Sequence, residues 1–254
     1  MPDETDVTIT ESAPVAPAPL FEETPFSRNI PTISAADQER LAASRVLVVG
    51  CGGLGGYAVE FLVRLGVGHI RVVDPDTFAE SNLNRQVLAT RVTLGRAKAE
   101  CARERALAIN PEVDVEPVVG FFTPENAAGL LAGCDVAVDA LDNPVSRVDL
   151  ERACAEAGLP MVHGAVRGRF LEAATILPGE GTLERLYGSA TMPGADNPNA
   201  LRTLKSCLSI TPPLAMGIEV SEVLNLLTGR PRAIGAGELA LLDLATLRLS
   251  RVKI

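Results

Sequence analysis

The sequence predicts an α/β fold in which a mainly parallel sheet carries helices on both faces and a small antiparallel strand region closes the C-terminus. Two observations support this prediction. Short valine-rich runs alternate with longer segments of helical composition between residues 45 and 165, as in parallel strands joined by crossover helices. A glycine-rich turn at residues 50–55 stands between the first run and the first of these helices, which is typical of Rossmann-like sheets.

Composition excludes several classes of protein. The chain has 254 residues, 47% of them hydrophobic, and a formal net charge of −9, with many acids before the first basic residue, Arg28. The remainder is nearly neutral, so a broad basic face for nucleic acid is not expected. The sequence starts without the basic and apolar segments of a signal peptide, and no uncharged apolar run reaches the length of a membrane span. We therefore expect a cytoplasmic protein without membrane contact.

The first half of the chain is expected to alternate helix and strand. The Ser34 hydroxyl can cap one helix, the next helix ends near Gly66, and a third stops before Pro111. The runs between them are rich in β-branched residues, which favour strands. The expected helices are Ala35–Ala43, Leu54–Leu65 and Ala97–Ile109, and the expected strands are Arg45–Val49, His69–Asp74 and Val113–Val119.

The second half continues this alternation and then changes character. Pro124 suits the first turn of a helix, where its missing N–H costs nothing. Helices are expected over Pro124–Leu131, Val145–Ala157 and Pro213–Leu227, and strands over Asp135–Asp139, Met161–Ala165, Phe170–Leu177 and a closing hairpin of Leu239–Leu244 with Thr246–Val252. The stretch 178–206 is rich in glycine, proline and polar residues, and loops of this length are usually functional or disordered.

These elements predict a single domain that follows an N-terminal arm. Residues 1–25 are rich in proline, glutamate, threonine and alanine and are expected to form a disordered acidic arm. Residues 26–254 form the domain, with a nucleotide-binding core at 26–177, the long loop at 178–206, and a C-terminal helix and strands at 207–254.

The glycine-rich turn has the G-x-G-x-x-G spacing of a phosphate-binding loop. Glycine lets a phosphate approach bare backbone, and the following helix N-terminus offers free N–H groups and a partial positive charge. An acid at the end of the second strand can accept a hydrogen bond from a ribose hydroxyl. The candidate nucleotide-binding residues are Gly50, Gly52, Gly53, Leu54, Gly55 and Asp74. The alternative is a turn that only packs helix against strand.

Cations near this turn favour a triphosphate over a dinucleotide. Arg85 follows the second strand, and Lys98 starts a predicted helix, where an exposed cation opposes the helix dipole at a cost of about 0.3–1 kcal/mol. A bound phosphate explains the position of Lys98, whereas Arg96 is expected to be a surface charge. Asp142, after the fourth strand, can hold Mg²⁺ against phosphate oxygens, and Asp139 is the alternative, or else a structural acid.

Four motifs in this order resemble the ThiF/MoeB/HesA family, bacterial relatives of ubiquitin-activating enzymes. They are G-C-G-G-L-G-G, D-P-D followed by N-L-N-R-Q, G-R-A-K-A-E, and D-A-L-D-N, and the resemblance runs from about residue 26 to residue 229. It implies an adenylation domain with a crossover loop at 178–206. The implied activity is ATP-dependent adenylation of a carboxylate, typically the C-terminal glycine of a small ubiquitin-like sulfur carrier, with release of pyrophosphate.

The resemblance also implies roles for individual residues. Asp74 would hold the ribose, Asp142 would coordinate Mg²⁺, and Arg28 would reach into the partner's site across a homodimer interface. The residues implied to bind phosphate are Asn82, Arg85 and Lys98, and the motifs add Asp76 and Asn143 to the nucleotide site. The candidate catalytic residues are therefore Arg28, Arg85, Lys98 and Asp142.

The chain departs from this family in its cysteines. Many members carry paired C-x-x-C motifs for structural zinc, but the five cysteines here are too widely spaced, so no zinc is expected. Cys207 resembles in position a family cysteine before the last core helix; it could contact the carrier or be an idle thiol. His163 is expected to be a core histidine rather than a pocket residue. Two other functions stay open: an NAD-dependent oxidoreductase and a non-catalytic adaptor that binds a carrier.

Overall fold

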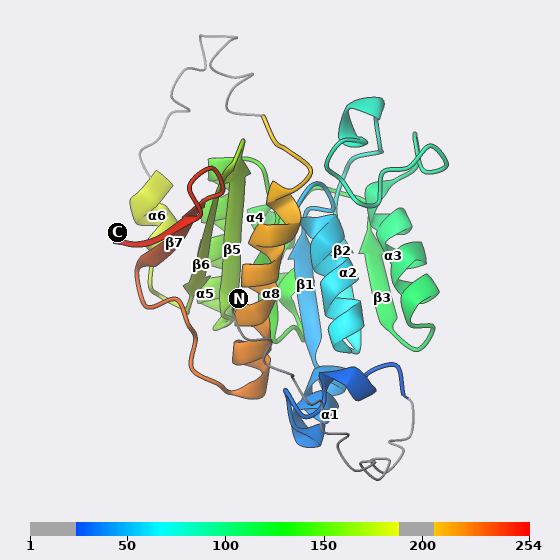
Figure 1. Ribbon diagram of the computed structural model, residues 1–254, viewed down its shortest axis with the longest axis horizontal. Helices are drawn as coiled ribbons and strands as arrows, with labels where there is room; N and C mark the ends of the chain where they lie inside the picture. Colours follow the sequence, from blue (N-terminus) through cyan, green and yellow to red (C-terminus); the bar gives the residue numbers. More distant parts are fainter. Residues whose placement is uncertain (1–23, 188–205) are drawn as a thin grey trace, which may run out of the picture.

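The computed structural model describes residues 24–187 and 206–254 and contains an eight-stranded sheet flanked by helices (Figure 1). The strands are β1 (Arg45–Val49), β2 (His69–Val73), β3 (Asp114–Val118), β4 (Val136–Asp139), β5 (Met161–Arg167), β6 (Phe170–Ile176), β7 (Glu238–Asp243) and β8 (Arg248–Lys253). The helices are α1 (Ala35–Ala43), α2 (Gly55–Leu65), α3 (Lys98–Ile109), α4 (Pro124–Leu131), α5 (Pro144–Ala157), α6 (Thr182–Tyr187) and α8 (Thr211–Thr228), with 3₁₀ turns η1 (Ser27–Asn29) and η2 (Glu80–Asn82).

The sheet has the strand order β3-β2-β1-β4-β5-β6-β7-β8. Pairs from β3 to β5 are parallel, and β6, β7 and β8 join antiparallel. This arrangement confirms the expected fold class, including the antiparallel C-terminal region. The chain leaves β1 for β2 on one side and later reaches β4 on the other, so the strand order reverses between β1 and β4. In open α/β sheets, ligands bind beside the carboxyl ends of the strands at such a reversal.

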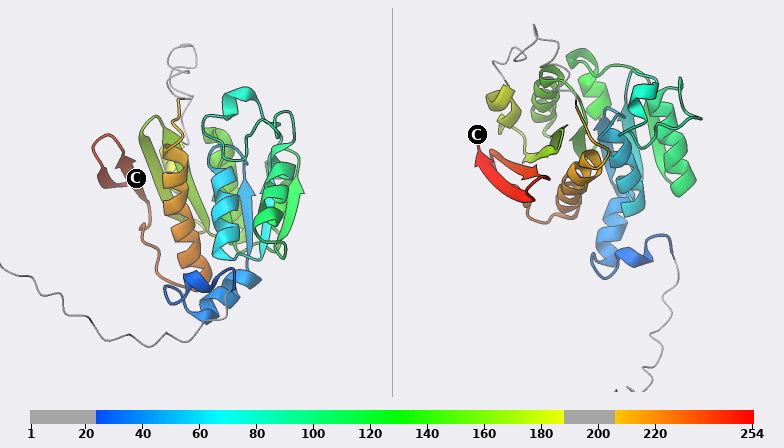
Figure 2. Two further views of the ribbon diagram at one scale, coloured as in Figure 1. Left: turned by 45° about the vertical axis from the view of Figure 1, so that its right-hand side comes forward. Right: turned by 45° about the horizontal axis from the view of Figure 1, so that its top comes forward.

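Helices cover both faces of the sheet. Figures 1 and 2 show α2, α3 and α8 on one face, and α4 and α5 on the other. Along β1, Val46 and Val48 pack into the core with α2 and α8, whereas Leu47 and Val49 pack into the core with α4 and α5. A strand buried on both sides needs apolar residues at every position, which explains its continuous valine-rich sequence.

Local signals set several element ends where the sequence predicts them. The Asp37 N–H donates to Ser34 Oγ over 3.1 Å and the Ser34 N–H donates to Asp37 Oδ2 over 3.1 Å, a reciprocal cap that starts α1. Pro124 opens α4, and α2 ends at Gly66 with φ of 93°, a left-handed conformation that favours glycine.

Most elements end within two residues of their expected bounds, with β5 running to Arg167 and α8 starting at Thr211. Two regions differ in a way that has a physical reason. The stretch expected as a loop at 178–206 contains α6, because Glu151 of α5 accepts the N–H groups of Leu183 and Glu184 over 3.0 and 2.8 Å. This cap comes from a distant part of the chain and leaves no local signal. The closing hairpin turns at residues 244–247, with Leu247 at φ of 54°, so β8 begins at Arg248 and not at Thr246.

Two sequence predictions fall on residues outside the described ranges. The expected acidic arm lies there except for residues 24 and 25, and so does most of the expected crossover loop, at 188–205. Within the described residues, every helix is too short or too polar to cross a lipid bilayer.

Candidate active site

A cavity of about 550 Å³ lies at the carboxyl ends of β1, β2 and β4, where the strand order reverses. Its walls bring together most of the residues that the sequence singles out for the nucleotide and its metal. These are Gly50, Gly52, Gly53, Leu54, Asp74, Asp76, Arg85, Lys98, Asp142 and Asn143. Cys207 also lines the cavity. Arg28, Gly55 and Asn82 are not among the lining residues.

The phosphate loop depends on two close backbone approaches. Gly50 has φ of 99°, and a Cβ there would lie 2.6 Å from the carbonyl oxygen of Ala140, so only glycine fits between β1 and β4. A Cβ at Gly55 would lie 1.7 Å from the carbonyl oxygen of Gly50. Gly55 therefore packs the start of α2 onto the turn, whereas Gly52 and Gly53 face the cavity.

Asp74 holds the loop in place from the end of β2. Its Oδ2 accepts the Cys51 N–H over 2.6 Å, and its Oδ1 accepts the Asp76 N–H over 2.8 Å. Burial raises the pKa of Asp74 more than these hydrogen bonds and Lys98 lower it. Each carboxylate oxygen has a second lone pair, so accepting a ribose hydroxyl is compatible with this arrangement.

Two cations line the phosphate side of the cavity. Lys98 is buried at the first turn of α3, and its Nζ lies 2.8 Å from Asp76 Oδ2, which offsets the unfavourable helix dipole. Arg85 donates from Nη1 to the Ser81 carbonyl over 2.8 Å and to Asn84 Oδ1 over 3.0 Å. Arg96, by contrast, is exposed and forms an ion pair with Glu104, as expected of a surface charge.

Asp142 lies in the turn between β4 and α5. Before it, the Leu141 N–H donates to Asp139 Oδ1 over 3.0 Å; after it, the Ser146 N–H donates to Asn143 Oδ1 over 2.9 Å and caps α5. Asp139 is fully buried and is absent from the cavity wall, which makes it the structural acid of the two alternatives. Asp142 is therefore the carboxylate that this turn offers to a ligand.

Besides Gly55, two candidate residues, Asn82 and Arg28, lie outside the cavity wall. Asn82 accepts the Ala79 N–H over 2.9 Å and closes η2, so its side-chain oxygen has a local partner. Arg28 is exposed in η1, and the neighbouring Asn29 donates to the Leu65 carbonyl at the end of α2. Because α2 starts at the phosphate loop, Arg28 lies at the opposite end of the sheet from the cavity of its own chain.

Sequence reasoning missed several cavity residues. Gln86 is 6% exposed, and its Oε1 finds no hydrogen-bond partner among the described residues. Phe121 and Phe122 follow β3 at the cavity wall, and Phe121 is 71% exposed. Arg147 of α5 also lines the cavity. Gln86 stands inside the N-L-N-R-Q motif, but nothing local in the sequence marks the other three.

Cys207 and His163 lie in different surroundings. Cys207 is half-buried in the cavity wall, its thiol donates to the Leu208 carbonyl over 3.5 Å, and burial raises its pKa. His163 is fully buried and bonded to Asp139, and it does not line the cavity. The expectation of a core histidine is confirmed.

The donor set fits a nucleoside triphosphate with a divalent ion. Gly52 and Gly53 leave room for phosphate where a side chain would stand, and Arg85 and Lys98 supply positive charge. Gln86 Oε1 has no partner among the described residues, so it is free to accept a hydrogen bond from a hydroxyl or amine of the nucleoside. Mg²⁺ needs only one or two carboxylates when phosphate oxygens complete its shell, and Asp142 is suitably placed. Within the described residues, no three His, Cys, Asp or Glu side chains gather as a metal site.

The fold and the cavity together define a Rossmann-like nucleotide-binding protein. The model of the ThiF family matches residues 26–254, and the chain belongs to this family. It is 37% identical over 211 residues to the SAMP-activating enzyme E1 of Haloferax volcanii, which covers 82% of this chain and 77% of the relative. It is 41% identical over 128 residues to the molybdopterin-synthase adenylyltransferase of Escherichia coli and 42% identical over 137 residues to the sulfur carrier protein adenylyltransferase of Thermus thermophilus. These matches cover 50% and 54% of this chain and 51% of each relative.

Solved structures share the fold. The Escherichia coli protein MccB, crystallised with MccA, aligns with a TM-score of 0.77 over 92% of this chain and 72% of that chain at 19% identity. PaaA aligns with a TM-score of 0.70 over 86% of this chain and 66% of that chain at 22% identity. At these identities the likeness shows the fold alone.

Proposed function

We propose that the protein is an ATP-dependent adenylyltransferase that activates the C-terminal carboxylate of a small ubiquitin-like sulfur carrier. One observation carries this proposal: a ThiF-family chain places the glycine cradle, Arg85, Lys98 and Asp142 around a single cavity. The names of three relatives at 37–42% identity, which activate SAMP, modify molybdopterin synthase or adenylylate a sulfur carrier, support the same activity.

The cavity residues divide the work of binding ATP. Gly52, Gly53 and the N-terminus of α2 bind phosphate through backbone N–H groups, and Asp74 receives the ribose. Phe121 offers an aromatic face to the adenine. Arg85 and Lys98 neutralise the phosphate charge. At an effective dielectric of about 20, each pair of opposite charges about 4 Å apart attracts by about 4 kcal/mol. Asp142 would hold Mg²⁺, which would supply further charge neutralisation when bound, and Asn143 lines the nucleotide site beside it.

The reaction itself needs little covalent chemistry from the protein. A carboxylate oxygen of the carrier forms a bond to the α-phosphorus while the bond from that phosphorus to the bridging oxygen breaks. The electron pair leaves with pyrophosphate, so no proton transfer is required. The contribution of Arg85 and Lys98 is to stabilise charge as it moves onto the leaving group, and that of the loop is to hold the two reactants in line.

The proposal has further parts that rest on the sequence and the family. Arg28 acts in the cavity of a second protomer, so the enzyme is a homodimer. The reaction takes place in the cytoplasm and requires Mg²⁺ but no zinc, since the cysteines lack C-x-x-C spacing. The domain comprises residues 26–254, and segment 178–206 is its crossover loop.

The test is Mg²⁺-dependent exchange of labelled pyrophosphate into ATP, with and without carriers encoded beside the gene. Exchange that needs a carrier supports the proposal. Absence of exchange with every carrier would contradict it. Separate titrations with ATP and NADH distinguish the alternatives: NADH binding without ATP binding indicates an oxidoreductase, and a carrier complex that forms without ATP indicates an adaptor.

A further inference from the structure

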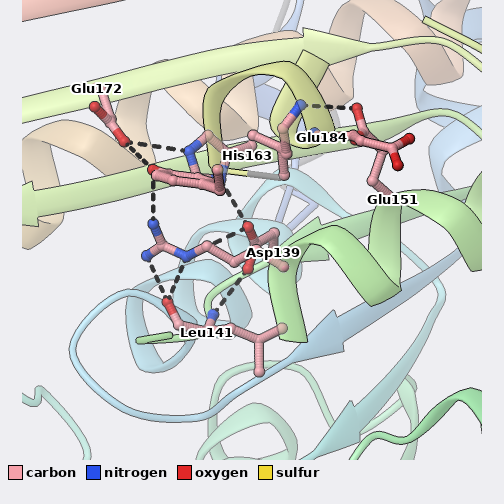
Figure 3. Close-up of polar contacts among 9 residues, drawn as sticks. Asp139, Leu141, Glu151, His163, Glu172 and Glu184 are labelled. Atoms are coloured by element: carbon pink, nitrogen blue, oxygen red, sulfur yellow. Dashed lines mark hydrogen bonds and ion pairs between the residues drawn. The ribbon is translucent and has the colours of Figure 1, made fainter. Parts of the chain in front are cut away.

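A buried polar network lies behind the cavity and joins five elements (Figure 3). His163 of β5 is fully buried, with Nδ1 2.6 Å from Asp139 Oδ2 and Nε2 3.4 Å from Glu172 Oε1. Tyr187 of α6 donates its hydroxyl to Glu172 Oε1 over 2.7 Å and accepts from Arg147 Nη1 over 3.3 Å. His163 thus bridges two carboxylates, and Arg147 connects the network to the cavity.

The charges of this network are balanced. Burial opposes the charge on His163, but its hydrogen bonds to Asp139 and Glu172 outweigh burial and raise its pKa, which favours the protonated ring. Burial likewise opposes ionisation of Glu172, yet His163, Tyr187 and Arg147 hold its pKa at about 2. Two cations therefore face two carboxylates.

One further titratable group approaches His163 from α8. The Glu219 carboxyl rests on the backbone of Gly164, where a Cβ would lie 1.8 Å from Glu219 Oε1. Its pKa is raised well above normal by burial and by Asp139, so it is neutral and does not disturb the balance.

The network ends on one residue of the cavity wall, Leu141. Arg147 donates from Nη2 to the Leu141 carbonyl over 2.6 Å, and its Nε lies 3.8 Å from Asp139 Oδ2. Asp139 in turn accepts the Leu141 N–H. Leu141 is thereby held at both its N–H and its carbonyl, directly before Asp142 in the chain. We call this arrangement the Leu141 clamp.

We propose that His163 is a positioning residue: by bridging Asp139 and Glu172 it holds the Leu141 clamp, and the clamp sets Asp142 for Mg²⁺ at the phosphate end of the cavity. Tyr187 is the second positioning residue, since it connects Glu172 to Arg147. This inference rests on the proposed function only through the role of Asp142 as the metal ligand.

Energetics favour a functional reason for the network over a purely structural one. Burying two ion pairs costs desolvation free energy, and well-packed apolar side chains of the same volume are often as stable. The polar network offers directional hydrogen bonds that an apolar core lacks. Through them, five elements fix the backbone of Leu141 on both sides of its Cα, beside the proposed metal ligand. Residues that orient metal ligands from behind typically change metal affinity by about 10–100-fold when they are mutated.

The test compares His163→Gln and Tyr187→Phe with the wild-type full chain. Gln carries both of its N–H donors on one nitrogen and so cannot replace the two separate ring nitrogens that face Asp139 and Glu172. Phe removes only the bridging hydroxyl. The matched control is Tyr57→Phe, which removes the same hydroxyl from the other tyrosine of the chain, outside the cavity lining. Calorimetry measures ATP binding over a range of Mg²⁺ concentrations and without Mg²⁺, and pyrophosphate exchange is measured over the same range.

We expect both variants to need about tenfold more Mg²⁺ for half-maximal binding and exchange, with little loss of rate at saturating Mg²⁺. Binding without Mg²⁺ and the Tyr57→Phe control stay unchanged. An unaltered Mg²⁺ requirement overturns the inference, and so does an equal loss of ATP affinity with and without Mg²⁺. If His163→Gln does not fold, the result for Tyr187→Phe decides. Shifted Mg²⁺-dependent binding without exchange in any variant or in wild type would instead refute the proposed function alone.

Discussion

Lys98 places a cation in the first turn of a helix, where the helix dipole disfavours it, and a bound phosphate would explain this position. Its side chain is 7% exposed at the N-terminus of α3, where its ammonium forms an ion pair with the exposed Asp76 carboxylate. We expect Lys98→Ala to lower pyrophosphate exchange by about 10²-fold, because one oriented charge in a water-poor site is lost. Arg96→Ala is the control, since it removes an exposed cation two residues away. Unchanged exchange in Lys98→Ala would remove this lysine from the site.

The buried carboxyl of Glu219 leads to a prediction about how stability depends on pH. Its carboxyl is 1% exposed, neither oxygen has a partner among the described residues, and burial raises its pKa well above normal. The folded state keeps this proton after the unfolded state has lost it. From about pH 5 upward to the raised pKa, the group therefore lowers the free energy of unfolding by about 1.4 kcal/mol per pH unit.

Glu219→Gln removes this pH dependence while keeping the shape of the side chain. We expect the variant to be more stable than wild type at pH 7.5, and the gain to be smaller at pH 5.5. Urea denaturation at both pH values measures it. An equal change in the free energy of unfolding at the two pH values would show that Glu219 does not retain its proton.

At the scale of elements, the junction of β1 and α2 tolerates little change. A methyl group at Gly55 would overlap the Gly50 carbonyl, so we expect Gly55→Ala to lower the free energy of unfolding by at least about 3 kcal/mol and to abolish ATP binding. Gly129→Ala is the matched control: Gly129 is exposed in α4 with open space around it, and alanine should stabilise that helix by about 0.5–1 kcal/mol. Denaturation of both variants tests the comparison.

Elements with local signals could be predicted from the sequence, and elements set by distant contacts could not. Ser34 and Pro124 mark helix starts within their own segments, so α1 and α4 match their expected ranges. The start of α6 depends on Glu151, which belongs to another helix. The same division holds in the cavity: glycine spacing reveals the phosphate loop, but no spacing reveals that Tyr187 contacts Arg147.

At the scale of the whole molecule, the two ends of the sheet carry different parts of the proposed enzyme. The carboxyl ends of the strands hold the cavity, and η1 with Arg28 lies beyond the other end, beside the last turn of α2. Arg28 could not reach the cavity of its own chain without leaving this position. A role in catalysis therefore requires a second protomer whose cavity faces η1, as in a symmetric dimer that exchanges residues between sites.

Mixing two inactive variants tests this arrangement. Arg28→Ala removes the residue that a protomer contributes to its partner's site. Lys98→Ala removes a residue of the protomer's own site. If the variants exchange subunits, one site of each mixed dimer has both residues intact and the other lacks both. An equal mixture forms mixed dimers for about half of its molecules, so we expect exchange activity to recover to about a quarter of wild type. Each variant alone stays near its own low rate, and a mixture no more active than the mean of the two, despite proven subunit exchange, would place Arg28 outside the partner's site.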